Sequence, residues 1–244
     1  DHFHQYFFPF TQGFKYANAN EIESVKSLVD EKTCAIMIEL VQGEGGVLPL
    51  DKSFVFEVAN LCKNKDLILI IDEVQTGIGR TGSLFAYQQY HIEPDLVTFA
   101  KGIGGGLPLG GFLANEKCSS VLSAGTHATT FGGNPIACAG ALEVLNQVND
   151  SLLQEVTDKG DYIKHKMNEF NLPHLLPVRG LGLMLAIPLK QLSPKEIAQT
   201  CIDEGLLILT AGKDALRLLP PLTISYEEID KGLAILKKVL ERAL

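Results

Sequence analysis

Two charged positions follow two short apolar runs of this sequence. Asp72, with Glu73 beside it, comes directly after Leu67–Ile71, and Lys101 comes directly after Leu96–Ala100. The runs are typical of buried strands, and their separation matches one strand–helix–strand unit of roughly 30 residues. Because ligands bind at the carboxyl edge of a parallel sheet, we expect the carboxylate and the ammonium to meet at one rim. The alternative is that both are solvated charges at the starts of loops.

Two glycine-rich stretches flank these positions. Gly102–Gly111 (GIGGGLPLGG) predicts a tight loop without regular structure, of the kind whose backbone approaches a ligand. Gly77–Gly82 (GIGRTG) fits the GxGxxG dinucleotide fingerprint, but it does not turn directly from the strand that ends at Ile71. Asp95 also begins the next strand, whereas the fingerprint needs an acid at its end. A nicotinamide-binding module is therefore only a third hypothesis.

A lysine and a carboxylate on one rim are the protein groups that pyridoxal phosphate chemistry requires. The carboxylate of Asp72 would keep a proton on the pyridine nitrogen, so that the ring withdraws charge from the substrate carbanion. Lys101 would form the Schiff base and, once released, would move the proton between substrate and cofactor. We therefore expect pyridoxal 5'-phosphate as cofactor. No metal is expected, since His2 and His4 have no third ligand at a suitable spacing.

Four segments in order resemble consecutive signatures of class III, fold-type I aminotransferases. Towards the C-terminus, RGLGLMLAIPL and LRLLPPLTIS are more similar to the acetylornithine branch of that family than to the GABA branch. The resemblance covers nearly the whole chain. The four segments are IELVQGEGG (Ile38–Gly46), IIDEVQTGIGRTG (Ile70–Gly82), DLVTFAKGIGGGLPLGG (Asp95–Gly111) and TTFGGNPIACAGALEVL (Thr129–Leu145).

The resemblance implies a role for each cofactor-binding residue. It makes Lys101 the Schiff-base lysine and Asp72 the partner of the ring nitrogen. Val74 would pack on a ring face, and Gln75 would reach the ring hydroxyl. Thr130 would bind the phosphate from the neighbouring subunit, which implies a homodimer with shared active sites; the alternative for Thr130 is a simple turn hydroxyl. The free N–H groups of the helix start that follows Thr130 also favour a phosphate.

Two further residues are expected to bind substrate. By the same resemblance, Arg217 would hold a substrate carboxylate through its guanidinium fork, and Glu44 would pair with that arginine. The alternative for Arg217 is a strand arginine whose stem covers apolar surface. Glu39 could support Asp72 or be a loop acid.

Composition excludes several classes of protein. The 244 residues are 46% hydrophobic and 20% charged, typical of a packed globular protein. The net charge of −8, from 29 acidic and 21 basic residues, argues against a nucleic-acid partner. No apolar run approaches the roughly 18 residues that span a bilayer, so no membrane association is expected. Five widely spaced cysteines without a CxxC pair indicate free thiols and a cytoplasmic location.

The predicted elements alternate between strand and helix over the first part of the chain. We expect strands at 34–40, 67–71 and 96–100, with helices at 20–30, 51–64 and 84–90. A longer helix should begin at Asn134-Pro135 and end near Val148. The remainder of the chain should form a helix (151–170), a strand (181–187), a helix (193–204), two strands (206–209 and 215–219) and a last helix capped by Ser225 and Glu228.

These elements predict an α/β protein of the pyridoxal-phosphate-dependent transferase fold type I. Residues 1–140 would be the C-terminal part of a large cofactor-binding domain with a mainly parallel sheet. Residues 141–244 would be a small α+β domain. The resemblance also implies an N-terminal portion with a phosphate-binding turn, a ring-stacking aromatic and a second arginine. None of these is found here, so we expect the isolated chain to bind cofactor weakly, to self-associate and to be inactive.

The expected activity is transfer of the terminal amine of N-acetylornithine to 2-oxoglutarate, in arginine biosynthesis. Ornithine, succinylornithine and GABA are the alternative substrates within the family. A hypothesis of another class is a catalytically silent protein that keeps only the fold and its interface.

Overall fold

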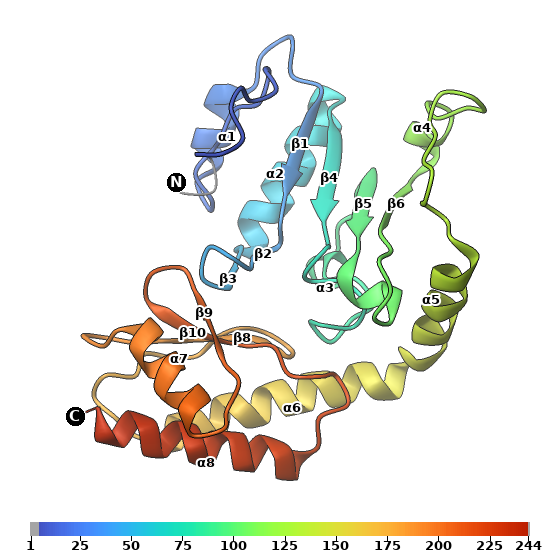
Figure 1. Ribbon diagram of the computed structural model, residues 1–244. Helices are drawn as coiled ribbons and strands as arrows, with labels where there is room; N and C mark the ends of the chain where they lie inside the picture. The colour runs from blue at the N-terminus through green and yellow to red at the C-terminus, as the bar shows by residue number, and fades with distance from the viewer. Residues whose placement is uncertain (1–4, 244) are drawn as a thin grey trace.

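The computed structural model describes residues 5–243, which form two sheets with helices around them (Figure 1). The first sheet has the strand order β1-β4-β5-β6. β1, β4 and β5 are parallel to one another, whereas β6 runs antiparallel to β5. The predicted mixed α/β architecture with a mainly parallel sheet is confirmed. The strands are β1 (Ala35–Ile38), β4 (Ile68–Asp72), β5 (Leu96–Phe99) and β6 (Gly111–Ala114).

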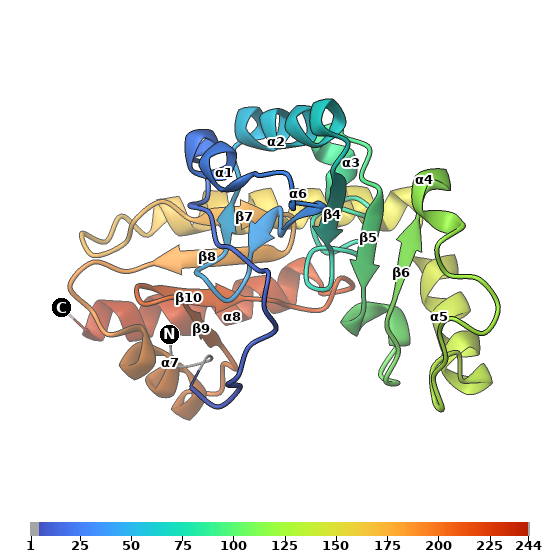
Figure 2. The same cartoon turned by 90° about the horizontal axis from the view of Figure 1, so that it is seen from above.

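Helix α2 (Lys52–Lys65) covers one face of this sheet. Its Phe54 and Val58 belong to the same buried cluster as Leu69 and Ile71 of β4, because alternate residues of a strand point to one face. In Figure 2, α1 and α2 lie along the same side of the molecule. The other helices of this part are α1 (Ile22–Leu28), α3 (Tyr87–Tyr90), α4 (Glu116–Ser119), α5 (Pro135–Gln147) and a 3-10 turn, η2 (Lys101–Gly104).

The second sheet is antiparallel, with the strand order β7-β8-β10-β9. Three helices pack on it and enclose the largest buried cluster, in which Leu185 and Ile187 of β8 meet Leu236 and Leu240. The strands are β7 (Arg179–Leu181), β8 (Met184–Pro188), β9 (Leu209–Ala211) and β10 (Ala215–Leu218). The helices are α6 (Asp150–Glu169), α7 (Pro194–Asp203) and α8 (Tyr226–Arg242). A separate hairpin joins β2 (Val41–Gln42) to β3 (Leu48–Pro49).

Two predicted helix caps form hydrogen bonds, and two do not. The predicted Asn20 cap of the first helix is wrong, because α1 begins at Ile22 with Glu21 at the N-cap position. The Asn134 side chain accepts hydrogen bonds from the amides of Ile136 and Ala137 at the start of α5. Ser225 and Glu228 form the predicted capping box of α8. Asp51 occupies the N-cap position of α2, but its side chain makes no capping hydrogen bond.

The structure corrects the predicted elements in three places. The glycine-rich stretch is not wholly irregular, since it begins in η2 and ends in β6, a strand that the sequence did not predict. The predicted strand at 181–187 is a hairpin of β7 and β8, because Gly182 turns the chain with φ 50°. The predicted strand at 206–209 lies later, at β9, because Leu206 packs with the main core of the second sheet. The division into domains at residue 140 stays a prediction.

Between residues 5 and 243, no group of three or more metal-binding side chains is found. His2 and His4 lie outside the described residues. No helix in the same range is long and apolar enough to cross a membrane. All five cysteines are free thiols.

Candidate active site

A cavity of about 370 Å³ lies between the two sheets. It is bounded by the residues that follow β4, by the start of η2, by α5 and by β10 with the segment after it. Among its lining residues, those with chemically active or polar side chains are Glu44, Gln75, Arg80, Lys101 and Arg217. Residues from far apart in the sequence therefore meet at one place, as expected for the carboxyl edge of the parallel strands.

Asp72 is the last residue of β4; it does not itself line the cavity, but the lining begins two positions later, at Val74. Its Oδ1 accepts a hydrogen bond of 2.9 Å from the amide of Val74 and one of 3.1 Å from the hydroxyl of Thr98. Thr98 lies directly opposite Asp72 in the parallel pairing of β4 and β5. The sequence analysis missed Thr98, because only the register of the two strands reveals that it faces Asp72. These bonds fix the orientation of the carboxylate.

Glu73 points the other way and is completely buried. Its carboxylate accepts hydrogen bonds from the hydroxyl of Thr76 at 2.5 Å, from the amide of Ala86 at 3.0 Å and from the amide of Tyr87 at 2.8 Å. Burial raises the pKa of Glu73 above its usual range, and these hydrogen bonds oppose the rise. Glu73 therefore ties together both ends of the segment that links β4 to α3.

Lys101 follows β5 and begins η2 with a positive φ of 49°. Such a backbone conformation is costly for a residue other than glycine and is concentrated at functional sites. The Lys101 side chain is exposed and lines the cavity. The glycines after it mostly serve packing rather than ligand approach: a Cβ on Gly105 would lie 3.1 Å from Val144 of α5. Only Gly102 of the glycine-rich stretch lines the cavity.

Arg217 of β10 reaches across the cavity to Glu44. Its NH1 donates a hydrogen bond of 2.6 Å to Glu44 Oε1, which also accepts one of 3.2 Å from Gln75. The hydrogen bond from Arg217 is the main cause that lowers the pKa of Glu44. The Arg217 side chain is only 10% exposed, and its Nε is buried without a hydrogen-bond partner. The guanidinium thus keeps donor capacity for a further anionic group.

Glu39 lies within electrostatic range of this group of residues. Burial raises the pKa of Glu39, the nearby Asp72 and Glu44 raise it further, and Lys101 lowers it. Its carboxylate also accepts a hydrogen bond from the backbone of Gly43. The sequence left the role of Glu39 open, and in the structure Glu39 lies near Asp72.

Thr130, like Asp72, is a predicted site residue that does not line the cavity. It is exposed in the segment before α5. Its neighbour Thr129 accepts a hydrogen bond of 3.1 Å from the amide of Gly132. The predicted role of Thr130 in the site of a second subunit stays a prediction.

The chain belongs to the class-III aminotransferase family, whose conserved region it matches over residues 3–240. It is 45% identical over 240 residues to an acetylornithine aminotransferase of Haemophilus ducreyi, covering 98% of this chain and 60% of that protein. A second enzyme of that name, from Listeria innocua, is 46% identical and is covered to 63%. The chain therefore spans about three fifths of the length of these relatives.

Solved structures of the same family share the fold. An N-acetylornithine aminotransferase from Stenotrophomonas maltophilia superposes with a TM-score of 0.86 at 34% identity, covering 94% of this chain and 62% of that one. An ornithine aminotransferase from Toxoplasma gondii superposes with a TM-score of 0.91 at 30% identity, covering 98% and 58%. The predicted fold type I of pyridoxal-phosphate-dependent transferases is thereby confirmed.

Proposed function

We propose that the protein is a pyridoxal-phosphate-dependent aminotransferase that moves the terminal amine of N-acetylornithine to 2-oxoglutarate, in arginine biosynthesis. The observation that carries the proposal is the meeting of Lys101 and the Glu44–Arg217 pair around one cavity, with Asp72 at the end of β4, two positions before the cavity-lining Val74. Two relatives named acetylornithine aminotransferase, each about 45% identical, support the choice of substrate.

The residues present fit the cofactor. A volume of about 370 Å³ lies within the range of small-molecule sites, roughly 300–1,000 Å³. The cavity offers an amine at Lys101, and the oriented carboxylate of Asp72 lies at the end of β4, just before the cavity-lining Val74. Val74 would pack on the ring, and Gln75 would donate to the ring hydroxyl. The structure of the Toxoplasma gondii neighbour is described as holding PLP at its active site.

When bound, pyridoxal phosphate supplies an electron sink for charge that develops on the substrate carbon. Asp72 strengthens that sink by holding a proton on the ring nitrogen. At about 3 Å and an effective dielectric near 20, the attraction is roughly 5 kcal/mol before desolvation is subtracted. Lys101 Nζ takes a proton from the amine-bearing carbon of the substrate and returns it later, as a general base and then a general acid. Thr98 would help to hold the carboxylate of Asp72 in a fixed orientation by its 3.1 Å hydrogen bond.

Arg217 and Glu44 would select between the two substrates. Glutamate presents a carboxylate near the reacting amine and needs the guanidinium of Arg217 free. N-acetylornithine presents uncharged methylene groups there, so the 2.6 Å pair with Glu44 can stay closed. The arginine is therefore never left as an unpaired buried charge.

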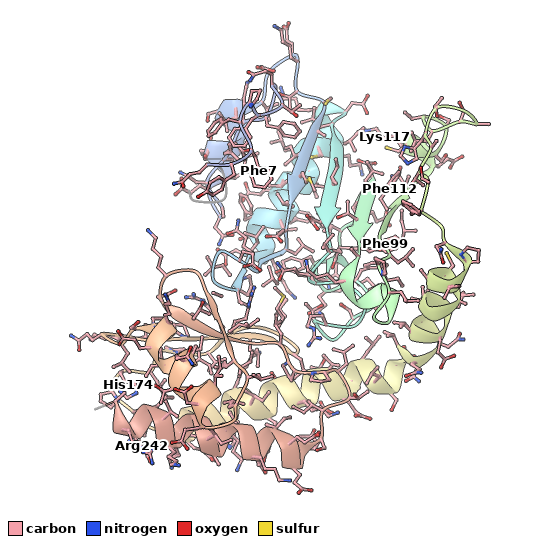
Figure 3. All side chains as sticks on the ribbon, viewed as in Figure 1. Phe7, Phe99, Phe112, Lys117, His174 and Arg242 are labelled. Atoms are coloured by element: carbon pink, nitrogen blue, oxygen red, sulfur yellow. The ribbon has the colours of Figure 1, made fainter. Side chains whose placement is uncertain are left out.

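We also propose a homodimer, located in the cytoplasm, in which Thr130 of each subunit binds the phosphate in the site of the other. The support is the apolar surface that runs from β6 to α5. Phe131 is 85% exposed and Ile136 is 73% exposed, with Phe112, Leu113, Val121 and Leu142 also exposed beside them in sequence. Figure 3 shows Phe112 at β6, which is an edge strand of the first sheet.

Ornithine is the second candidate substrate, because several solved neighbours are ornithine aminotransferases. The test is glutamate formation from 2-oxoglutarate by the protein purified as its own cell makes it, with N-acetylornithine, ornithine, succinylornithine or GABA. We expect the highest kcat/KM with N-acetylornithine. Lys101→Ala should abolish transfer, and Lys195→Ala, an exposed lysine on α7, should leave it unchanged. Absence of transfer with all four amines would favour the catalytically silent alternative.

A further inference from the structure

Arg80 joins the segment after β4 to the end of the ladder between β8 and β10. We propose that Arg80 is a positioning residue that sets Arg217 at its correct distance from Lys101 and Asp72, and so determines affinity for the dicarboxylate substrate. The proposal rests on the function proposed above. It gives a role to the GIGRTG segment, which resembles a nucleotide fingerprint but lies in a different context.

The guanidinium of Arg80 bridges two strand ends of the second sheet. Its NH1 donates to the carbonyl of Pro220 at 2.6 Å and to the carbonyl of Leu183 at 3.3 Å. In the pairing of β10 with β8, Leu218 lies opposite Leu185. Pro220 lies two positions after Leu218, and Leu183 lies two positions before Leu185, so both acceptors are just beyond this last pair. Arg80 therefore connects the two chain segments by hydrogen bonds just beyond the last backbone pair of β8 and β10.

The backbone of Arg80 makes the attachment two-sided. The amide of Leu183 donates a hydrogen bond of 3.1 Å to the carbonyl of Arg80. The chains also approach too closely for side chains between them: a Cβ on Gly182 would lie 2.8 Å from the Arg80 carbonyl oxygen and 2.6 Å from the carbonyl carbon of Thr81. Figure 1 and Figure 2 both show the loop between β4 and α3 lying against the region of α6 and the second sheet.

Arg80 is held just as firmly on the side of the first sheet. Glu73, buried next to Asp72, binds the amides of Ala86 and Tyr87 and so closes the segment that carries Arg80. The side chain of Gln89 donates a hydrogen bond of 2.8 Å to the carbonyl of Thr81, next to Arg80. A short, fastened segment thus leads from Asp72 to the guanidinium.

The chemistry of Arg80 suits carbonyl binding rather than ion pairing. Burial lowers the pKa of Arg80 to about 10, and no acidic side chain contributes to that shift. Its two hydrogen-bond acceptors are carbonyl oxygens just outside β8 and β10, and both bonds come from one terminal guanidinium nitrogen. That nitrogen lies one bond further from the backbone than a lysine ammonium, so lysine would not reach both carbonyls. Pro220 is only three positions after Arg217, so movement of Pro220 would change where Arg217 and its Glu44 partner lie.

The test compares Arg80→Met and Arg80→Lys with Arg242→Lys in the protein as its own cell makes it. Arg242 is the control because it lies at the end of α8, far from the cavity (Figure 3), and pairs with Glu204 at the end of α7. Three quantities are measured: the dissociation constant for glutarate, an unreactive dicarboxylate; KM and kcat with glutamate; and hydrogen exchange of the amides in residues 183–187 and 216–224.

We expect both Arg80 variants to raise the glutarate dissociation constant and the glutamate KM about tenfold or more, as for loss of a hydrogen bond to a charged group. The value of kcat should change less than about threefold, because the proton-transfer groups stay in place. Exchange in both segments should become faster. The proposal would be overturned if the glutarate dissociation constant and the glutamate KM equalled those of Arg242→Lys, or if only kcat decreased.

The outcomes separate this inference from the proposed function. If the unaltered protein transfers no amine, the proposed function is wrong, and hydrogen exchange still decides whether Arg80 fastens the strand ends. If Arg80→Met fails to fold, Arg80→Lys, which keeps the charge and the apolar stem, decides by the same measurements. Unchanged amide hydrogen exchange in a folded Arg80 variant would show that Arg80 does not hold residues 183–187 and 216–224 in place.

Discussion

Asp72 carries the electrostatic part of the proposed chemistry. Asp72→Asn keeps the shape and the acceptor for Val74 and Thr98 but removes the charge. We expect the transition state to lose about 3 kcal/mol of stabilisation, as when one preorganised electrostatic group is removed, and kcat to fall accordingly. The free energy of unfolding should change much less. Steady-state kinetics and urea denaturation measure the two quantities, with Thr98→Val as a milder control. Near-normal turnover of Asp72→Asn would disprove the role.

Glu44 is predicted to act on one half-reaction more than on the other. Glu44→Ala leaves Arg217 without its 2.6 Å partner when an uncharged chain occupies the site. The half-reaction with N-acetylornithine should therefore slow more than the half-reaction with glutamate, whose carboxylate replaces Glu44. Single-turnover kinetics measures each half-reaction separately. Equal losses in both would remove the proposed selection between substrates.

Gly182 tests the contact between the elements, because it is the turn of the β7–β8 hairpin that touches the segment of Arg80. Gly182→Ala adds a Cβ 2.6 Å from the backbone of Thr81 at a φ of 50°. We expect a loss of about 3 kcal/mol in the free energy of unfolding. Gly205→Ala is the matched control, since Gly205 has φ 92° but nothing within 4 Å of its added Cβ. It should lose about 1 kcal/mol from backbone strain alone.

Equal losses in the two variants, measured by urea denaturation, would mean that the close contact at Gly182 contributes nothing. A larger loss at Gly182 would show that the second sheet depends on the loop after β4.

Elements with a clear local signal could be predicted from the sequence. The apolar run of β4 and the Asn134-Pro135 start of α5 carry their signals within a few residues. β6 could not be predicted, because its first residue is a glycine and its extended conformation depends on backbone pairing with β5. Arg80 was missed for a similar reason: its acceptor at Pro220 is 140 positions away in the sequence.

Some of the site residues also have a local sequence signal, whereas others depend on partners far away in the sequence. Asp72 and Lys101 each end an apolar strand, so their meeting at one rim follows from the topology of parallel strands. Arg217 and Glu44 are 173 positions apart, and only the family resemblance paired them. Thr98 needs the strand register, which no local pattern contains.

The whole molecule leaves α4, α5 and the segment between them at one edge, away from the second sheet (Figure 1). Ile136→Asp should weaken self-association at least about tenfold, because a charge would enter a buried apolar interface. An acid in the first turn of α5 favours that helix, so the fold should persist. Phe56→Asp is the control, since Phe56 is 59% exposed on α2. Sedimentation equilibrium measures the association, and equal dissociation constants for both variants would place the interface elsewhere.

The central claim is that Lys101 is the residue that holds the cofactor, and peptide mapping tests it most directly. The protein as its cell makes it is mixed with pyridoxal phosphate, reduced with borohydride and digested, and the modified lysine is located by mass spectrometry. We predict the pyridoxyl group on Lys101, where a strand end, a positive φ and the cavity coincide. A pyridoxyl group confined to another lysine, or no modification at all, would contradict the account.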